Sequence, residues 1–203
     1  MILSTLLNNF FPLTVRLILG KALLFFIVWK FVFLFFLRET KIVDYPLTEN
    51  VGEYSTMLLN TFVSSPEFTV KREFRKDNNM QGKVFQHEVS QVYYNKKKVA
   101  YVDDGCNGLE LMVGFIGFIF CLPSPLKRKI KYLILGLLTI YCLNILRCSG
   151  LIYINLYYQP YFDLAHRYWL KGAMYSIVFI MWMLYLRKVD LDYYFPKTKM
   201  GTI

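Results

Sequence analysis

Residues 104–111 read DGCNGLEL, and here a polar segment of the chain stops and an apolar run begins. The residues just before, Val99-Ala100-Tyr101-Val102, are mostly β-branched or aromatic, which is typical of a strand. The residues just after, 109–122, are apolar except for Glu110. We therefore expect Cys106 to stand where a strand of the polar segment meets a membrane-embedded helix, at the surface of a bilayer.

The whole chain is more apolar than a soluble domain of its size. It has 203 residues, of which 56% are hydrophobic and 18% aromatic. Several apolar runs approach the roughly 20 residues that cross a hydrocarbon core about 30 Å thick. We expect a polytopic α-helical membrane protein with about four transmembrane helices. Their expected ranges are about 17–37, 105–122, 130–148 and 168–186.

The segment between the first two spans, residues 38–105, contains no run that could cross a membrane. Apolar residues recur at helical spacing between Val51 and Phe62, with Asn50 placed as an N-cap, which indicates an amphipathic helix on the membrane surface. Further on, residues 92–94 and 99–102 flank a polar turn, as in a β-hairpin. The sequence thus predicts a small α+β segment outside the membrane. Residues 1–15 are read as an interfacial or irregular lead-in.

Charge orients the spans. Four basic residues crowd positions 127–131 between the second and third spans, and short loops rich in Lys and Arg remain in the cytoplasm. This orientation places both termini in the cytoplasm and the segment 38–105 outside. Three residues then lie together at the outer membrane surface: Cys106 before the second span, Arg147 at the end of the third and His166 before the fourth.

Other functions find less support in the residues. Basic and aromatic residues do not alternate on one face, so no nucleic-acid partner is expected. No C-x-x-C spacing occurs and His87 and His166 are the two histidines, so neither a metal nor another cofactor is expected. Cys121 and Cys142 fall in apolar runs and are interpreted as inert buried thiols. Lys30 lies deep in the first run, and its role stays open.

The thiol of Cys106 has both a chemical and a structural interpretation. Unpaired N–H groups at a helix N-terminus favour a thiolate, whereas Asp103 and Asp104 oppose it unless a cation offsets them. Cys106 could also be a small residue at a helix start, or form a disulfide with Cys148, which is expected at the same membrane surface.

Arg147 and His166 also admit structural interpretations. An arginine at the end of a span can reach water or pair with Glu110, while Asn144 lies on the same helix face as Arg147. His166 could belong to an interfacial aromatic belt. Together with Cys106, however, a histidine can transfer protons and a guanidinium can stabilise an oxyanion.

These residues, in this order, resemble the exosortase/archaeosortase superfamily. The resemblance rests on Cys106-Asn107-Gly108-Leu109 opening a span, Asn144-Ile145-Leu146-Arg147 closing the next, and His166 before the last. It extends over residues 92–186, leaving the first span and most of the outer segment outside. Common exosortases have about twice as many spans, so the chain is more similar to short forms from Bacteroidota.

The resemblance implies roles for these residues. Cys106 would be the nucleophile, Arg147 would orient the substrate or stabilise the transition state, and His166 would be the general acid and base. Asn107, Gly108, Glu110 and Asn144 would support them or orient the substrate. The expected division of the chain is an interfacial lead-in and first transmembrane helix at 1–37, an extracytoplasmic segment with an amphipathic helix and a β-hairpin at 38–105, a three-helix core that resembles the catalytic core of exosortases at 106–187, and a cytoplasmic tail at 188–203.

The implied activity is cleavage of C-terminal sorting signals of exported proteins through a thioester, with transfer to an acceptor. The expected location is the inner membrane of a bacterium, with the active site facing outward. The expected partners are the lipid bilayer, an exported protein with a C-terminal helix, and either a partner membrane subunit or a second copy of the chain. The alternative is a non-enzymatic membrane subunit or binding module that docks a partner through residues 38–105. A transporter is less favoured, because the ionisable residues lie mostly at the ends of the spans.

Overall fold

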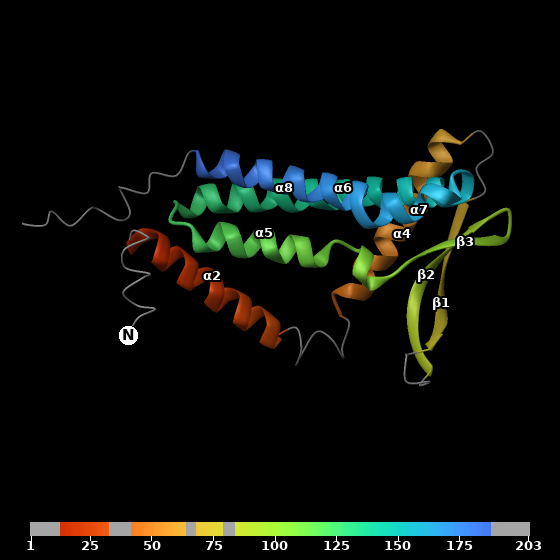
Figure 1. Cartoon of the computed structure of the whole chain (residues 1–203), viewed down its shortest axis with the longest axis horizontal. Helices are drawn as coiled ribbons and strands as arrows, with labels where there is room; N and C mark the ends of the chain where they lie inside the picture. The colour runs from red at the N-terminus through yellow and green to blue at the C-terminus, as the bar shows by residue number, and fades with distance from the viewer. Residues whose placement is uncertain (1–12, 33–41, 64–67, 79–83, 188–203) are drawn as a thin grey trace, which may run out of the picture.

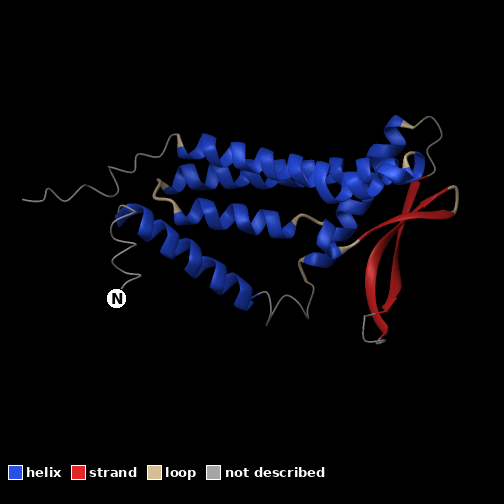
Figure 2. Ribbon diagram, viewed as in Figure 1, coloured by secondary structure: helices blue, strands red, loops and turns tan. Residues whose placement is uncertain are grey.

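The computed structural model describes residues 13–32, 42–63, 68–78 and 84–187. Three helices, α5, α6 and α8, run side by side along the long axis, α2 leans beside α5, and α4 and a three-stranded sheet lie at the far end (Figure 1). Figure 2 shows the division between this helical part and the sheet. The elements are α2 (Leu13–Val32), α4 (Asp44–Phe62), β1 (Phe68–Asn78), β2 (Val84–Tyr94), β3 (Lys97–Val102), the 3-10 turn η2 (Asp104–Cys106), α5 (Leu109–Cys121), α6 (Leu126–Tyr157), the 3-10 turn η3 (Gln159–Tyr161), α7 (Phe162–Leu164), the π-turn η4 (Ala165–Trp169) and α8 (Leu170–Leu186).

Two helical segments of the described chain are long and apolar enough to cross a membrane, Leu126–Tyr157 and Gln159–Leu186. α5 is also apolar, but its 13 residues are fewer than a bilayer normally requires. α2 has 20 residues and carries Arg16, Lys21 and Lys30. A membrane-spanning helical protein is therefore supported, whereas the count of four spans stays a prediction.

The core of the helical part lies where α5, α6 and α8 meet. Phe115, Ile140 and Tyr185 are fully buried there. Gly136 of α6 permits this packing, because a side chain at that position would collide with the ring of Phe115. On the outer side of α6 and α8, large apolar residues such as Leu138 are exposed, as expected for surfaces that face lipid.

The prediction of an inert buried thiol is wrong for Cys142. Its side chain is exposed on α6, whereas that of Cys121 is buried. A residue in an apolar run can face lipid as readily as the protein interior, and sequence composition does not distinguish these environments.

α6 is longer than the expected third span. It continues to Tyr157 rather than ending near Cys148, and most of the expected loop 150–167 is helical. The extension packs against the sheet, because Ile152 is buried with Val92 in one apolar cluster. Asn155 also donates a hydrogen bond to the backbone carbonyl of Val99.

α4 begins at Asp44, so the predicted N-cap at Asn50 is wrong. Its apolar side contacts the sheet and α6 rather than a membrane surface, because Val51 and Leu59 are buried. Small residues make the approach close: Ser55 Oγ donates to the carbonyl of Ile145 on α6 at 3.2 Å. The amphipathic pattern is real, but its partner is the protein itself.

The sheet is an antiparallel meander in the order β1-β2-β3. β2 and β3 form the predicted hairpin, in which Gln91 pairs with Tyr101. Asn95 and Lys96 connect them with φ angles of 49° and 64°, as in the tight turns that match strand twist. β3 ends at Val102 and leads directly to Cys106. Residues 1–12, most of the expected lead-in, and 33–41, which include the end of the first run, lie outside the described residues.

Candidate active site

Cys106 lies in a short turn between the sheet and α5. Its N–H donates to the carbonyl of Asp103 at 2.8 Å, which closes the 3-10 turn η2. α5 begins at Leu109, so the expected helix start near Gly105 is wrong. The reason is Gly108, whose φ of 82° turns the chain before the helix and is a conformation that favours glycine. Cys106 therefore precedes α5 instead of belonging to its first turn.

Asn144 of α6 holds the backbone of this turn. Its Nδ2 donates to the carbonyl oxygen of Cys106 at 2.8 Å. Asn144 is fully buried and lies so close to Gly108 that a Cβ there would be 3.2 Å from its side-chain carbon. The predicted supporting residues Asn144 and Gly108 thus contact each other beside Cys106.

Arg147 lies one helical turn after Asn144 and is 7% exposed. Its Nη1 donates to Asn144 Oδ1 at 3.3 Å, and its Nη2 lies 3.9 Å from the sulfur of Cys106. Its Nε is buried and has no hydrogen-bond acceptor among the described residues. The ion pair with Glu110 that the sequence left open is not formed in the described part of the chain; the Glu110 side chain is exposed.

His166 lies in the π-turn η4 and is half-buried. Its ring stacks on Phe162 with centroids 5.6 Å apart. Within the described residues no hydrogen bond joins His166 to Cys106. The fold therefore brings Cys106 and Arg147 into contact, whereas the contact described for His166 is with Phe162.

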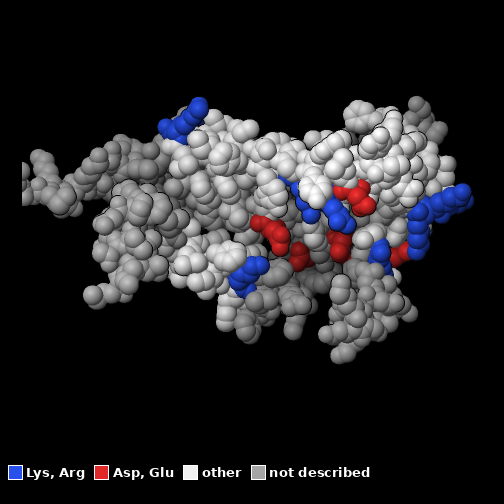
Figure 3. Space-filling view, in the orientation of Figure 1, with Lys and Arg blue, Asp and Glu red and all other residues white. Residues whose placement is uncertain are grey.

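A cavity of about 110 Å³ adjoins the cysteine turn. Its lining includes Gly105, Asn107 and Gly108 of the cysteine turn together with Arg147 and Lys171. Figure 3 shows that charged side chains gather around the junction of the helices with the sheet end, while most of the described helical surface carries none. The cavity is a polar recess at the end of an apolar helix bundle.

A comparison with known families identifies the chain. The family model described as transmembrane exosortase matches residues 3–186. This chain belongs to the transmembrane exosortase family. The match includes the first helical run and the outer segment, so the expectation that only residues 92–186 resemble exosortases is wrong. No curated protein and no solved structure matches the chain significantly.

All four cysteines of the exosortase are free thiols in the structure. Cys148 is buried, and its sulfur lies 3.6 Å from the carbonyl oxygen of Cys106, in donor position. Asn144 and Cys148 thus approach the same carbonyl. This arrangement replaces the disulfide that the sequence left open. His87 is in β2, and its side chain lies outside the described residues.

Sequence reasoning missed the contribution of α4 to the exosortase site. Asn107 Nδ2 donates to Asp44 Oδ1 at 2.9 Å and lies 3.3 Å from Thr48 Oγ1. A weak local signal existed, because an acidic residue shortly before Pro46 is common at the start of a helix. Nothing local shows that this acid is buried against a residue 63 positions away.

Proposed function

We propose that this exosortase is a membrane-embedded cysteine peptidase or transpeptidase that cleaves C-terminal sorting signals of exported proteins. The observation that carries the proposal is the contact between the sulfur of Cys106 and the guanidinium of Arg147 at 3.9 Å. The spare N–H donors of this guanidinium can stabilise an oxyanion that forms next to the sulfur. The adjoining cavity is lined by Arg147 and by Gly105 and Asn107, the two neighbours of Cys106 in the chain, so a peptide carbonyl bound there would lie beside the cysteine turn.

The reaction begins with attack of the Cys106 thiolate on the carbonyl carbon of the scissile peptide bond. The carbonyl oxygen becomes an oxyanion, and the buried Arg147 Nε, which has no acceptor among the described residues, can donate to it. His166 gives a proton to the leaving amine as the C–N bond breaks. A thioester between Cys106 and the substrate remains.

An acceptor amine or water then attacks the thioester carbonyl and releases the Cys106 thiolate, while His166 accepts the proton of the nucleophile. Amine attack produces a new amide bond, as in a transpeptidase, and water produces a carboxylate, as in a peptidase. No metal or other cofactor takes part in these steps.

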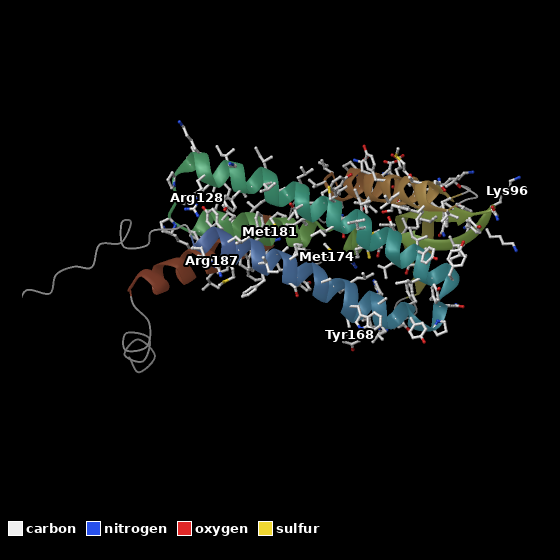
Figure 4. The ribbon with its side chains drawn as sticks, turned by 90° about the horizontal axis from the view of Figure 1, so that it is seen from above. Lys96, Arg128, Tyr168, Met174, Met181 and Arg187 are labelled. Atoms are coloured by element: carbon white, nitrogen blue, oxygen red, sulfur yellow. The ribbon has the colours of Figure 1, made fainter. Side chains whose placement is uncertain are left out.

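The topology proposed for this chemistry has four spans with both termini in the cytoplasm. The distribution of charged ends supports it: Arg128 and Arg187 lie at one end of the helices and Lys96 at the other (Figure 4). The cysteine turn lies toward the Lys96 end, where β3 joins α5 (Figure 1). The site then faces outward from the inner membrane of a bacterium.

The proposed substrate is an exported protein with a C-terminal membrane helix followed by basic residues. Such a helix would lie in the bilayer beside the enzyme, with its cleavage motif at the outer surface and its basic end inside. A partner subunit or a second copy of the chain would complete the enclosure of this helix.

The experiment that tests the proposal compares the C-termini of surface proteins in the native host with wild-type enzyme and with Cys106→Ala at equal expression. We expect a protein that retains its C-terminal helix and basic end in the variant alone, with the variant still present in the membrane. Cys142→Ala is the matched control, since this exposed thiol on α6 lies outside the site. Unchanged C-termini would favour the non-enzymatic docking subunit instead.

A further inference from the structure

Asn107, which follows the proposed nucleophile Cys106, is held by residues of α4. The side chain of Asn107 is 1% exposed and inserts between α4 and α5. Its Nδ2 donates to Asp44 Oδ1 at 2.9 Å and lies 3.3 Å from Thr48 Oγ1. Its Oδ1 accepts the backbone N–H of Leu109 at 2.9 Å. Both ends of the Asn107 amide are thus used, and it links α4 to the start of α5.

Cys106 is therefore held from two sides. On one side Asn144 of α6 binds its carbonyl oxygen at 2.8 Å. On the other side the next residue, Asn107, is bound by α4 through Asp44. The peptide that joins Cys106 to Asn107 lies between these two anchors. A shift of either anchor would move the sulfur relative to the guanidinium of Arg147.

The carboxylate of Asp44 lies in an unusual environment. Asp44 is the first residue of α4 and is 9% exposed. An acid in the first turn of a helix is commonly explained by the helix dipole, but that effect needs no burial. A buried carboxylate is costly unless it accepts hydrogen bonds, and the amide of Asn107 supplies one. The hydrogen bond from Asn107 thus offsets part of the cost of burying the Asp44 carboxylate.

Asp44 also borders open space near the site. With Asn107, Gly105 and Glu110 it lines a cavity of about 130 Å³ on the side of α2, next to the recess that contains Arg147. Its carboxylate contacts Asn107, and among the described residues it makes no hydrogen bond with the Cys106 side chain. Asp44 can therefore act on the reaction through Asn107.

We propose that Asp44 is a positioning residue, which acts through Asn107 to hold the Cys106 turn in the geometry that places the sulfur beside Arg147. This inference rests on the proposed function, because it assigns Asp44 a role in the same reaction. It makes α4 of the outer segment a part of the catalytic unit rather than a separate docking module.

The test uses full-length Asp44→Ala, Asp44→Asn, Asn107→Ala and the double variant Asp44→Ala/Asn107→Ala. Substrate processing is measured on the surface protein that retains its C-terminal helix in the Cys106→Ala variant. We expect Asp44→Ala to slow processing by roughly ten- to a hundredfold, since small displacements of a reacting group have effects of this size. Asp44→Asn retains an oxygen that accepts from Asn107 and should restore processing to within a few-fold of wild type.

The double variant distinguishes positioning from a general effect on α4. If Asp44 acts through Asn107, the double variant should be no slower than Asn107→Ala alone. If Asp44 only stabilises the helix start, the two losses should multiply and the amount of protein in the membrane should fall. Glu53→Ala, which removes an exposed acid of the same helix, is the matched control. Multiplying losses, or full activity of Asp44→Ala, would overturn the inference.

A second readout does not depend on a substrate. The rate of alkylation of Cys106 by a membrane-impermeant maleimide is measured in the same variants, with Cys142→Ala as the background. Asp44→Ala should change this rate by about fivefold or more, since one charge-assisted hydrogen bond restrains the turn, and Asp44→Asn should not. Unchanged alkylation in Asp44→Ala would contradict the inference. If no C-terminus depends on Cys106, the proposed function fails, and the alkylation rates still decide whether Asp44 positions the turn.

Discussion

At the scale of single residues, Asn144 connects the parts of the site. It donates to the carbonyl of Cys106 and accepts from Arg147, so one buried amide orients both the turn and the guanidinium. An amide can do this because it carries a donor and an acceptor on one planar group. Gly108 complements it, since its positive φ brings the turn against Asn144 without a side chain in between.

Replacement of Asn144 should therefore impair the reaction more than the fold. We expect Asn144→Ala to slow processing by about tenfold or more, because the Cys106 carbonyl loses a donor and Arg147 loses an acceptor. Asn144→Asp restores an acceptor for Arg147 but provides no donor, and it should remain slow. Processing rates at equal membrane abundance check this, with Cys142→Ala as control. Wild-type processing by Asn144→Asp would show that the hydrogen bond to Cys106 is dispensable.

At the scale of elements, the helical part depends on close contact between α5 and α6. Gly136 and the ring of Phe115 form this contact, and Phe115 is fully buried. Dispersion and close packing stabilise helix association in a bilayer, so small residues at such contacts matter. The distance between these two helices also sets the distance between Cys106 and Arg147, because Arg147 is part of α6 and Cys106 directly precedes α5.

A larger residue at position 136 should separate the two helices. We expect Gly136→Val to destabilise the protein by about 1–3 kcal/mol, the usual cost of overpacking. Thermal unfolding in detergent measures this. Gly172→Ala of α8 is the matched control, since nothing lies within 4 Å of a Cβ at that position. A melting temperature of Gly136→Val equal to that of wild type would mean that α5 and α6 are not tightly packed there.

The sheet carries its own charge-dependent contact. Glu73 of β1 accepts hydrogen bonds from Lys98 of β3, at 2.6 Å, and from the hydroxyl of Tyr93 of β2. These bonds, that from Lys98 first, hold the pKa of Glu73 below its ordinary value of 4.5. The pKa of Glu73 is lower in the folded chain than in the unfolded chain. This stabilisation is therefore complete at neutral pH and is lost as the pH falls through the folded pKa.

The hairpin should therefore loosen in acid through Glu73. Corrected hydrogen-exchange protection of the strands should be higher in wild type than in Glu73→Gln at about pH 7, and the two should converge as the pH falls below the lowered pKa of Glu73. Glu53→Gln, an exposed acid on α4, serves as control. A difference that persists at low pH would mean that the carboxylate charge does not stabilise the sheet.

At the scale of the whole molecule, charge and apolar surface divide the chain along its long axis. The bundle exposes apolar residues, while charged groups gather toward the sheet and at the opposite helix ends (Figures 3 and 4). In the topology we propose, the membrane crosses the bundle, and α4, the sheet and the last turns of α6 form one body outside it. The site lies at the border of the two.

This arrangement predicts which positions a membrane-impermeant thiol reagent reaches. In a background that lacks Cys106 and Cys142, Lys96→Cys in the hairpin turn should be labelled in intact cells. Lys127→Cys in the basic loop should be labelled only after the membrane is opened. Labelling of Lys127→Cys in intact cells would mean that the site faces the cytoplasm.

Local patterns in the sequence were sufficient for much of this description. Apolar runs indicated the membrane helices. The β-branched and aromatic residues on either side of the polar turn 95–98 indicated the hairpin, and the end of that hairpin located Cys106. Cysteine, arginine and histidine could be grouped by expected membrane depth, because a bilayer orders residues along one axis. These signals depend on neighbouring residues, which is why they can be read without a fold.

Tertiary contacts determined the rest. The extension of α6 to Tyr157 depends on apolar surface from the sheet, and the start of α5 depends on a glycine packed against Asn144. Two residues at the same membrane depth can lie far apart in the plane of the membrane. The contact of Arg147 with Cys106 is therefore visible only in the folded chain. The bond between Asp44 and Asn107 joins residues 63 positions apart. Such a pairing is selected by the packing of α4 on α6 and the sheet, and no local pattern encodes it.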